Sequence, residues 1–61
     1  MDAEQFKHAR EVLGMTQTEL AHKVGVKPSK HMDRTVRRWE NGERKIHGSV
    51  AILVEMLLRD I

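Results

Sequence analysis

Residues 33–42 are the most informative segment of this chain, and they read Asp33-Arg34-Thr35-Val36-Arg37-Arg38-Trp39-Glu40-Asn41-Gly42. On a helix, Val36 and Trp39 share one face because they are three residues apart, whereas the three arginines fall largely on the other side. Asp33 can accept a hydrogen bond from a free backbone N–H at a helix start, and Asn41-Gly42 is a turn signal. The segment therefore predicts a short helix over residues 34–40, with one face in a core and cations on the other.

A helix of this kind suits the major groove of DNA, where arginine can donate two hydrogen bonds to O6 and N7 of guanine. An ordinary amphipathic helix, whose arginines only keep the protein in solution, would show the same pattern. Residues 27–45 hold seven Lys and Arg against three Asp and Glu, a balance of +4, whereas the rest of the chain holds four against six, a balance of −2. This basic segment indicates a polyanionic partner such as nucleic acid, although acidic lipid or an acidic protein would also suit it.

Length and composition argue against several other classes of protein. The 61 residues make one small domain, and the absence of cysteine argues against disulfides and thiolate metal sites, as expected of a cytoplasmic protein. The apolar stretch 50–58 contains Glu55 and is too short to cross a membrane. No two histidines have the i, i+4 spacing of a helical zinc site, and neither serine lies in a Gly-x-Ser-x-Gly motif. We therefore expect no enzymatic activity, no metal or other cofactor, no membrane association and no small-molecule substrate.

Three further helices flank residues 34–40. Capping boxes, in which two side chains bond to each other's backbone N–H groups, predict helices over residues 2–13 and 17–24. Their members are Asp2 with Gln5 and Thr16 with Glu19. Ser49 is a candidate cap for a last helix over residues 49–59, and residues 27–32 are expected to form a loop. The chain is therefore predicted to be all-α.

Two features of these helices are unusual. Arg10 lies beside the apolar stripe of its helix, where a charged side chain is found when it is paired or when its stem covers apolar surface and its head reaches water. In the last helix, Ile52 and Met56 widen the apolar stripe beyond what one small core needs. This surplus predicts a homodimer contact through Ile52 and Met56, unless the two side chains cover a shallow core or are merely exposed.

Two segments carry a resemblance to a known family. They read Leu13-Gly14-Met15-Thr16-Gln17-Thr18-Glu19-Leu20-Ala21-His22-Lys23-Val24-Gly25-Val26 and Val36-Arg37-Arg38-Trp39-Glu40-Asn41-Gly42. The first looks like the first half of the helix-turn-helix in the Cro and phage-repressor (XRE-like) family. The second resembles that family's recognition helix with its closing Glu-Asn-Gly. The resemblance implies a small all-α, lambda-repressor-like domain of four helices, or five, that binds double-stranded DNA.

The resemblance also implies roles for individual residues. Those placed near base edges are Asp33, Arg34, Thr35, Arg37 and Arg38. Those placed near the DNA backbone are Gln17, Asn41, Arg44 and Lys45. Lys27 and Lys30, with His31, fall in a connection longer than the family usually has; they would also lie near the DNA backbone and add electrostatic attachment there. Arg10 and Glu40 match an ion pair that ties the family's first helix to its recognition helix. For Asp33 we favour a helix cap over a base contact.

These roles imply a sequence-specific regulator of transcription. We expect a dimeric repressor that reads an inverted-repeat operator whose half-sites are about one helical turn apart. By analogy with small regulators of this kind, it would control its own phage or mobile-element operon, including anti-CRISPR-associated operons, and a regulator of a restriction–modification operon would look the same. The alternative is an antitoxin or an adaptor that binds a different protein through its apolar last helix.

Overall fold

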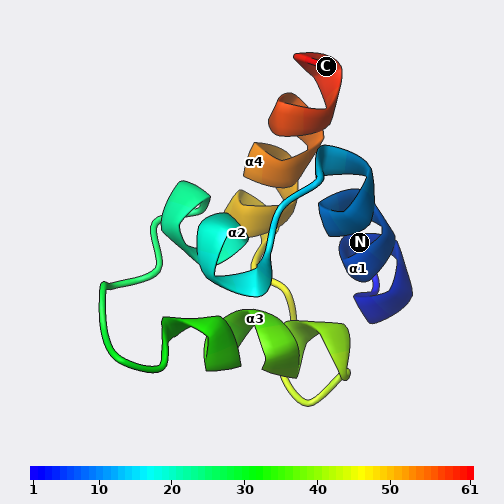
Figure 1. Ribbon diagram of the computed structural model, residues 1–61. Coiled ribbons are helices and arrows are strands. Elements are labelled where there is room, and N and C mark those ends of the chain that lie inside the picture. The colour runs from blue at the N-terminus through cyan, green and yellow to red at the C-terminus, as the bar shows by residue number, and fades with distance from the viewer.

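Four helices and their connections make up the protein, and the computed structural model describes all of residues 1–61 (Figure 1). In chain order the helices are α1 (Ala3–Leu13), α2 (Gln17–Lys23), α3 (Met32–Glu40) and α4 (Gly48–Arg59). No strand and no fifth helix is present. The prediction of an all-α domain with four helices is confirmed, and the fifth helix that the resemblance allowed is absent.

The first two helices begin at their capping boxes. The Asp2 carboxylate accepts a hydrogen bond from the backbone N–H of Gln5 at 2.8 Å, and the Gln5 side chain accepts one from the Asp2 N–H at 3.0 Å. Thr16 and Glu19 make the same pair of bonds at 3.1 and 2.9 Å. Each box satisfies two of the N–H groups that a helix start leaves without a partner. Gly14 ends α1 in the left-handed conformation, with φ of 67°, which glycine adopts at low cost.

The other two helices begin earlier than predicted. α3 begins at Met32, and its N-cap residue is His31, whose side chain makes no capping hydrogen bond. Asp33 is the second residue of the helix, so the interpretation of Asp33 as the cap is wrong. α4 begins at Gly48 with an uncapped His47 before it, so Ser49 is not its cap either. Met32 packs against the core, and this tertiary contact rather than a polar cap holds the first turn of α3.

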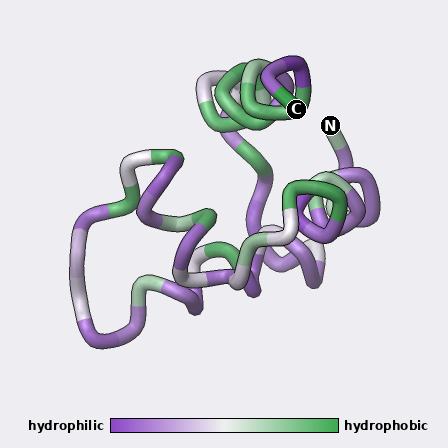
Figure 2. Tube along the Cα trace, turned by 45° about the horizontal axis from the view of Figure 1, so that its top comes forward, coloured by the Kyte–Doolittle hydropathy of each residue, from purple (hydrophilic) through white to green (hydrophobic).

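The core lies where the helices meet and contains only apolar side chains. Its nine buried members are Phe6, Ala9, Leu20, Ala21, Val24, Val36, Trp39, Val50 and Val54. α2 packs against α3, and α1 packs against both α3 and α4. The rings of Phe6 and Trp39 meet edge to face with centroids 5.5 Å apart, which joins α1 to α3. Figure 2 shows α4 as the most continuously hydrophobic part of the tube and the connection between α2 and α3 as largely hydrophilic.

One ion pair reinforces the contact between α1 and α3. Arg10 Nε lies 2.6 Å from Glu40 Oε2, and Arg10 Nη2 donates to Glu40 Oε1 at 3.3 Å. Arg10 Nη1 also donates to the backbone carbonyl of Met15 at 3.0 Å. Only 17% of the Arg10 side chain and 4% of the Glu40 side chain are exposed, so solvent screens the pair little. A guanidinium therefore ties α1, the α1–α2 connection and the end of α3 together.

We expect Glu40→Ala to lower the free energy of unfolding by about 3–5 kcal/mol, because it leaves a largely buried guanidinium without its carboxylate. Chemical denaturation followed by the fluorescence of Trp39, the one tryptophan, measures the change. The matched control is Arg37→Ala, which removes the exposed Arg37–Asp33 pair and should cost less than about 1 kcal/mol. Equal losses in the two variants would contradict a special role for the Arg10–Glu40 pair.

Acid should weaken the start of α2. The pKa of Glu19 lies below the ordinary value for a glutamate, chiefly because its carboxylate accepts a hydrogen bond from the backbone N–H of Thr16, and also because of the Thr16 side chain. A carboxylate whose pKa is lowered by folding stabilises the native state above its unfolded pKa, and this stabilisation is lost as pH falls through the folded pKa.

The free energy of unfolding of wild type should therefore exceed that of Glu19→Gln by a constant amount at neutral pH, and the difference should shrink below about pH 4.5. Denaturation of both proteins at several pH values measures this difference. A difference that stays constant into the acid range would show that the charge of Glu19 contributes nothing to the cap.

Candidate nucleic-acid interface

α3 separates two kinds of side chain. Val36 and Trp39 are buried in the core, whereas Arg34, Arg37 and Arg38 are exposed. The separation follows from the helical period, because residues three apart share a face and the arginines fall between the buried positions. The helix thus presents three cations on the side that faces away from the core.

The charged groups on this outer side differ in their partners. Arg37 Nη2 lies 3.5 Å from Asp33 Oδ2, one helical turn earlier. No ion pair or side-chain hydrogen bond engages Arg34 or Arg38. Thr35 and Asp33 are partly buried, so they lie at the border of the exposed surface. All five side chains assigned to base edges therefore lie on one helix, and two of its guanidinium groups have all their donors free.

Gln17, the first residue of α2, is held by the end of α3. Its Nε2 donates to Glu40 Oε1 at 3.2 Å, so the Glu40 carboxylate receives bonds from both Arg10 and Gln17. The sequence gives no sign of this contact, because the two residues are far apart in the chain and no local pattern links them. The amide nitrogen carries a second N–H, which points to no protein partner among the hydrogen bonds of the structure.

The connection between α2 and α3 is a loop, as expected from Pro28. It swings away from the end of α2 and returns to the start of α3 at one side of the domain (Figure 1). Lys27, Lys30 and His31 are all exposed in it. The loop therefore places two cations beside the N-terminal end of the arginine-bearing helix.

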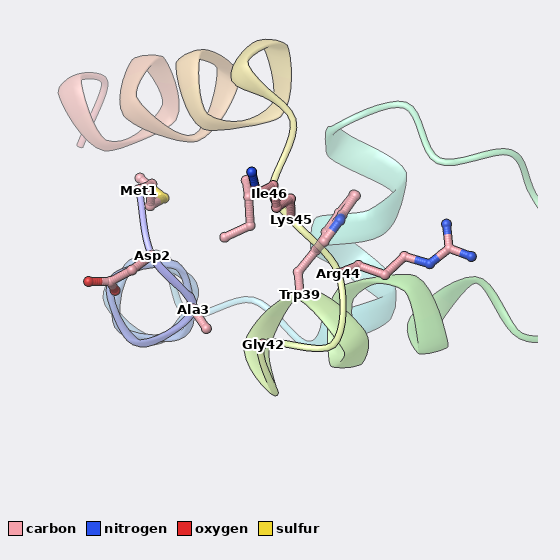
Figure 3. Close-up of a pocket in the computed structure, with 8 residues that line it drawn as sticks. All are labelled: Met1, Asp2, Ala3, Trp39, Gly42, Arg44, Lys45 and Ile46. Carbon is pink, nitrogen blue, oxygen red and sulfur yellow. The ribbon is translucent and has the colours of Figure 1, made fainter.

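The connection that follows α3 carries the other predicted backbone contacts. Asn41 is the C-cap of α3, and Arg44 and Lys45 follow it, all exposed. This connection and the start of α1 enclose a hollow of about 360 Å³ against Trp39. Figure 3 shows the guanidinium of Arg44 directed away from Met1 and the hollow, toward the side on which α3 runs. Cations therefore flank α3 at both ends.

The two residues predicted for a dimer contact lie on a different part of the surface. Ile52 and Met56 of α4 are 58% and 54% exposed, so they are not part of the core. A neighbouring groove of about 460 Å³ runs between α1 and α4. It is lined by Met1, Gln5, His8, Ala9, Val12, Glu55 and Leu58. The exposed apolar surface and the arginines of α3 thus belong to different helices.

Two further features are absent from the structure. None of the four helices has the length and hydropathy needed to span a bilayer. No three His, Asp or Glu side chains are arranged to hold a metal ion.

Comparison with known proteins gives two curated relatives. The chain is 51% identical over 47 residues to the type II methyltransferase M.SsoII of Shigella sonnei, which covers 77% of this chain and 12% of the relative. It is 62% identical over 38 residues to the type II methyltransferase M1.ScrFI of Lactococcus lactis subsp. cremoris, which covers 62% of this chain and 9% of the relative. The chain thus spans only about a tenth of the length of these enzymes. No solved structure matches it.

A family comparison covers most of the chain. The helix-turn-helix family model matches residues 6–59, which include nearly all of the four helices described above. The match, the packing of α2 on α3 and the exposed arginines of α3 agree with one another. The chain belongs to the Cro and repressor-like helix-turn-helix family, whose domains bind DNA.

Proposed function

We propose that this protein is a sequence-specific DNA-binding regulator of transcription that acts as a dimeric repressor. The observation that carries the proposal is the division of α3 into a buried face with Trp39 and an exposed face with three arginines. A helix with this division can enter a major groove while its orientation stays fixed by the core. Arg34 and Arg38, whose donors are free, would contact guanine edges, and Arg37 and Thr35 would contact the neighbouring bases.

The flanking polar residues would fix the position of the protein on the duplex. Phosphate contacts set register and orientation without reading sequence. The free N–H of Gln17 would reach a phosphate at the start of α2, where the helix dipole favours an anion. The residues proposed for the remaining backbone contacts are Lys27, Lys30, Asn41, Arg44 and Lys45.

The homodimer would form through α4. Ile52 and Met56 expose apolar area beside the groove between α1 and α4, and a domain with only nine buried residues gains much from covering such area. Two copies related by a two-fold axis would place two α3 helices in successive major grooves, so the operator would be an inverted repeat with half-sites about 34 Å apart. Overlap of the operator with a promoter would block transcription.

The genetic setting is proposed by analogy. Small regulators of this family control their own operons in phages and mobile elements, and anti-CRISPR-associated operons are one such setting. The similarity to type II methyltransferases adds a second setting, the operon of a restriction–modification system. Footprinting of the protein on the DNA upstream of its own gene tests autoregulation directly.

The second candidate is an antitoxin or an adaptor that holds a different protein. The observation that favours it is the same exposed apolar surface of α4, which does not by itself determine the identity of the partner. The two candidates differ in oligomeric state, because the repressor requires two copies of this chain in solution.

Sequence-specific binding should depend on Arg38. We expect Arg38→Ala to weaken binding to the preferred duplex by about 1–3 kcal/mol and to relax the preference at one base pair. Titration of duplexes selected from a randomised pool, with each base pair then replaced in turn, measures both effects. Arg59→Ala, which removes a cation at the end of α4, is the matched control and should leave the preference intact. If Arg38→Ala keeps its full discrimination, Arg38 does not read a base.

The dimer should depend on the apolar surface of α4. We expect Ile52→Glu or Met56→Glu to give a folded monomer, because a carboxylate would have to be buried without a partner in the interface. Light scattering coupled to size exclusion measures the mass, and the control Lys7→Glu changes an exposed residue of α1 outside the groove. A wild type that is already monomeric, or a double variant that stays dimeric, would reject α4 as the homodimer surface.

A further inference from the structure

Asp33 is the only carboxylate on the exposed side of α3. The other acid of the helix, Glu40, is turned inward and engaged by Arg10. The Asp33 side chain is 32% exposed, makes no capping bond, and has one polar contact, to Arg37 at 3.5 Å. Asp33 thus lies in the first turn, where the helix dipole favours an acid, but its side chain caps no backbone N–H.

An acid at this position carries a cost in any complex with DNA. Its charge opposes the attraction between the cations of α3 and the phosphates. Its pair with Arg37 is exposed, so it stabilises the fold only weakly, as i, i+4 pairs on helix surfaces do. These small contributions to stability do not offset the repulsion from phosphates, and the contact with Arg37 gives Asp33 a second possible effect, on the geometry of Arg37.

The geometry suits such an effect. A guanidinium has five N–H donors, and the bond from Arg37 Nη2 to Asp33 occupies one of them. Four remain, and bidentate recognition of guanine O6 and N7 uses two. A long side chain that is already held at its end loses less rotamer entropy on binding. Its remaining N–H donors are also less free to turn toward a neighbouring base. Arg34 and Arg38 have no comparable tether.

We propose that Asp33 is a positioning residue for Arg37, which it holds for bidentate recognition of one guanine in the major groove. The carboxylate lowers the general attraction to DNA and raises the discrimination at that base pair. This inference rests on the proposed function, since it requires α3 to enter a major groove.

The test uses the full chain and duplexes selected by wild type from a randomised pool. For Asp33→Ala we expect discrimination at one G·C pair to fall about twofold, which is the effect that the loss of one exposed i, i+4 pair can supply. Affinity for unrelated duplexes should rise at the same salt concentration, because a negative charge is removed. Arg37→Ala should lose discrimination at the same base pair, and the double variant should lose no more than Arg37→Ala alone.

A matched control separates positioning from charge. Glu43→Ala also removes an exposed acid next to α3, in the connection that follows it, so it should raise general affinity and leave every base preference unchanged. Arg37→Lys is a second probe, because it keeps the charge but not the planar fork, and it should lose discrimination at the same base pair as Asp33→Ala. Circular dichroism of each variant verifies that the domain keeps its helix content.

Two outcomes would overturn the inference alone. In one, Asp33→Ala retains its discrimination at every base pair; in the other, it loses discrimination at base pairs that neither Arg37 variant affects. Failure of wild type to select any sequence from the pool is a different outcome, and it would remove the proposed function together with the inference.

Discussion

The Glu40 carboxylate is the point at which three parts of the chain meet. It receives Arg10 from α1 and Gln17 from α2, and it belongs to the last residue of α3. Taking an arginine and a glutamate out of water is expensive, and it is tolerated when the remaining donors and acceptors are satisfied. They are satisfied in this protein, because no buried side-chain nitrogen or oxygen is left without a partner. The orientation of α3 is therefore fixed at its C-terminal end by directional bonds as well as by packing.

Two adjacent residues hold the C-terminal end of α3, one by apolar packing and the other by polar contacts. Trp39, which contacts Phe6 edge to face, directly precedes Glu40. Because both anchors face inward, the arginines of the same helix must face outward, and the exposed surface of α3 is a consequence of how its inner side is held. The family match over residues 6–59 includes both anchors and all of α3.

The parts of the fold that could be predicted from sequence are those with local causes. The capping boxes of α1 and α2 and the buried pair Val36 and Trp39 depend on residues a few positions apart, so their spacing is visible in the chain. The caps assigned to Asp33 and Ser49 were wrong because the packing of Met32 and Val50 determines where those helices begin. Sequence alone offered no means of locating such tertiary contacts.

The same limit applies to the candidate site. Arg10 stood out beside an apolar stripe, but the resemblance to a family, not the spacing, assigned its partner Glu40. The bond between Gln17 and Glu40 spans 23 residues and left no pattern in the sequence. The bond between Asp33 and Arg37 has i, i+4 spacing, so it could have been predicted from the sequence. It was not predicted because Asp33 was interpreted as a helix cap.

The arrangement of the helices has one more consequence, for how such a protein can change over time. α1 packs on both α3 and α4, so the apolar surface of α4 and the arginines of α3 are attached to a common support rather than to each other. Substitutions on the exposed surface of α4 can thus accumulate without changing how α3 is held, and the reverse is equally true. The methyltransferase relatives share with this chain a region of only about a tenth of their length, so a similar sequence also occurs within much longer proteins.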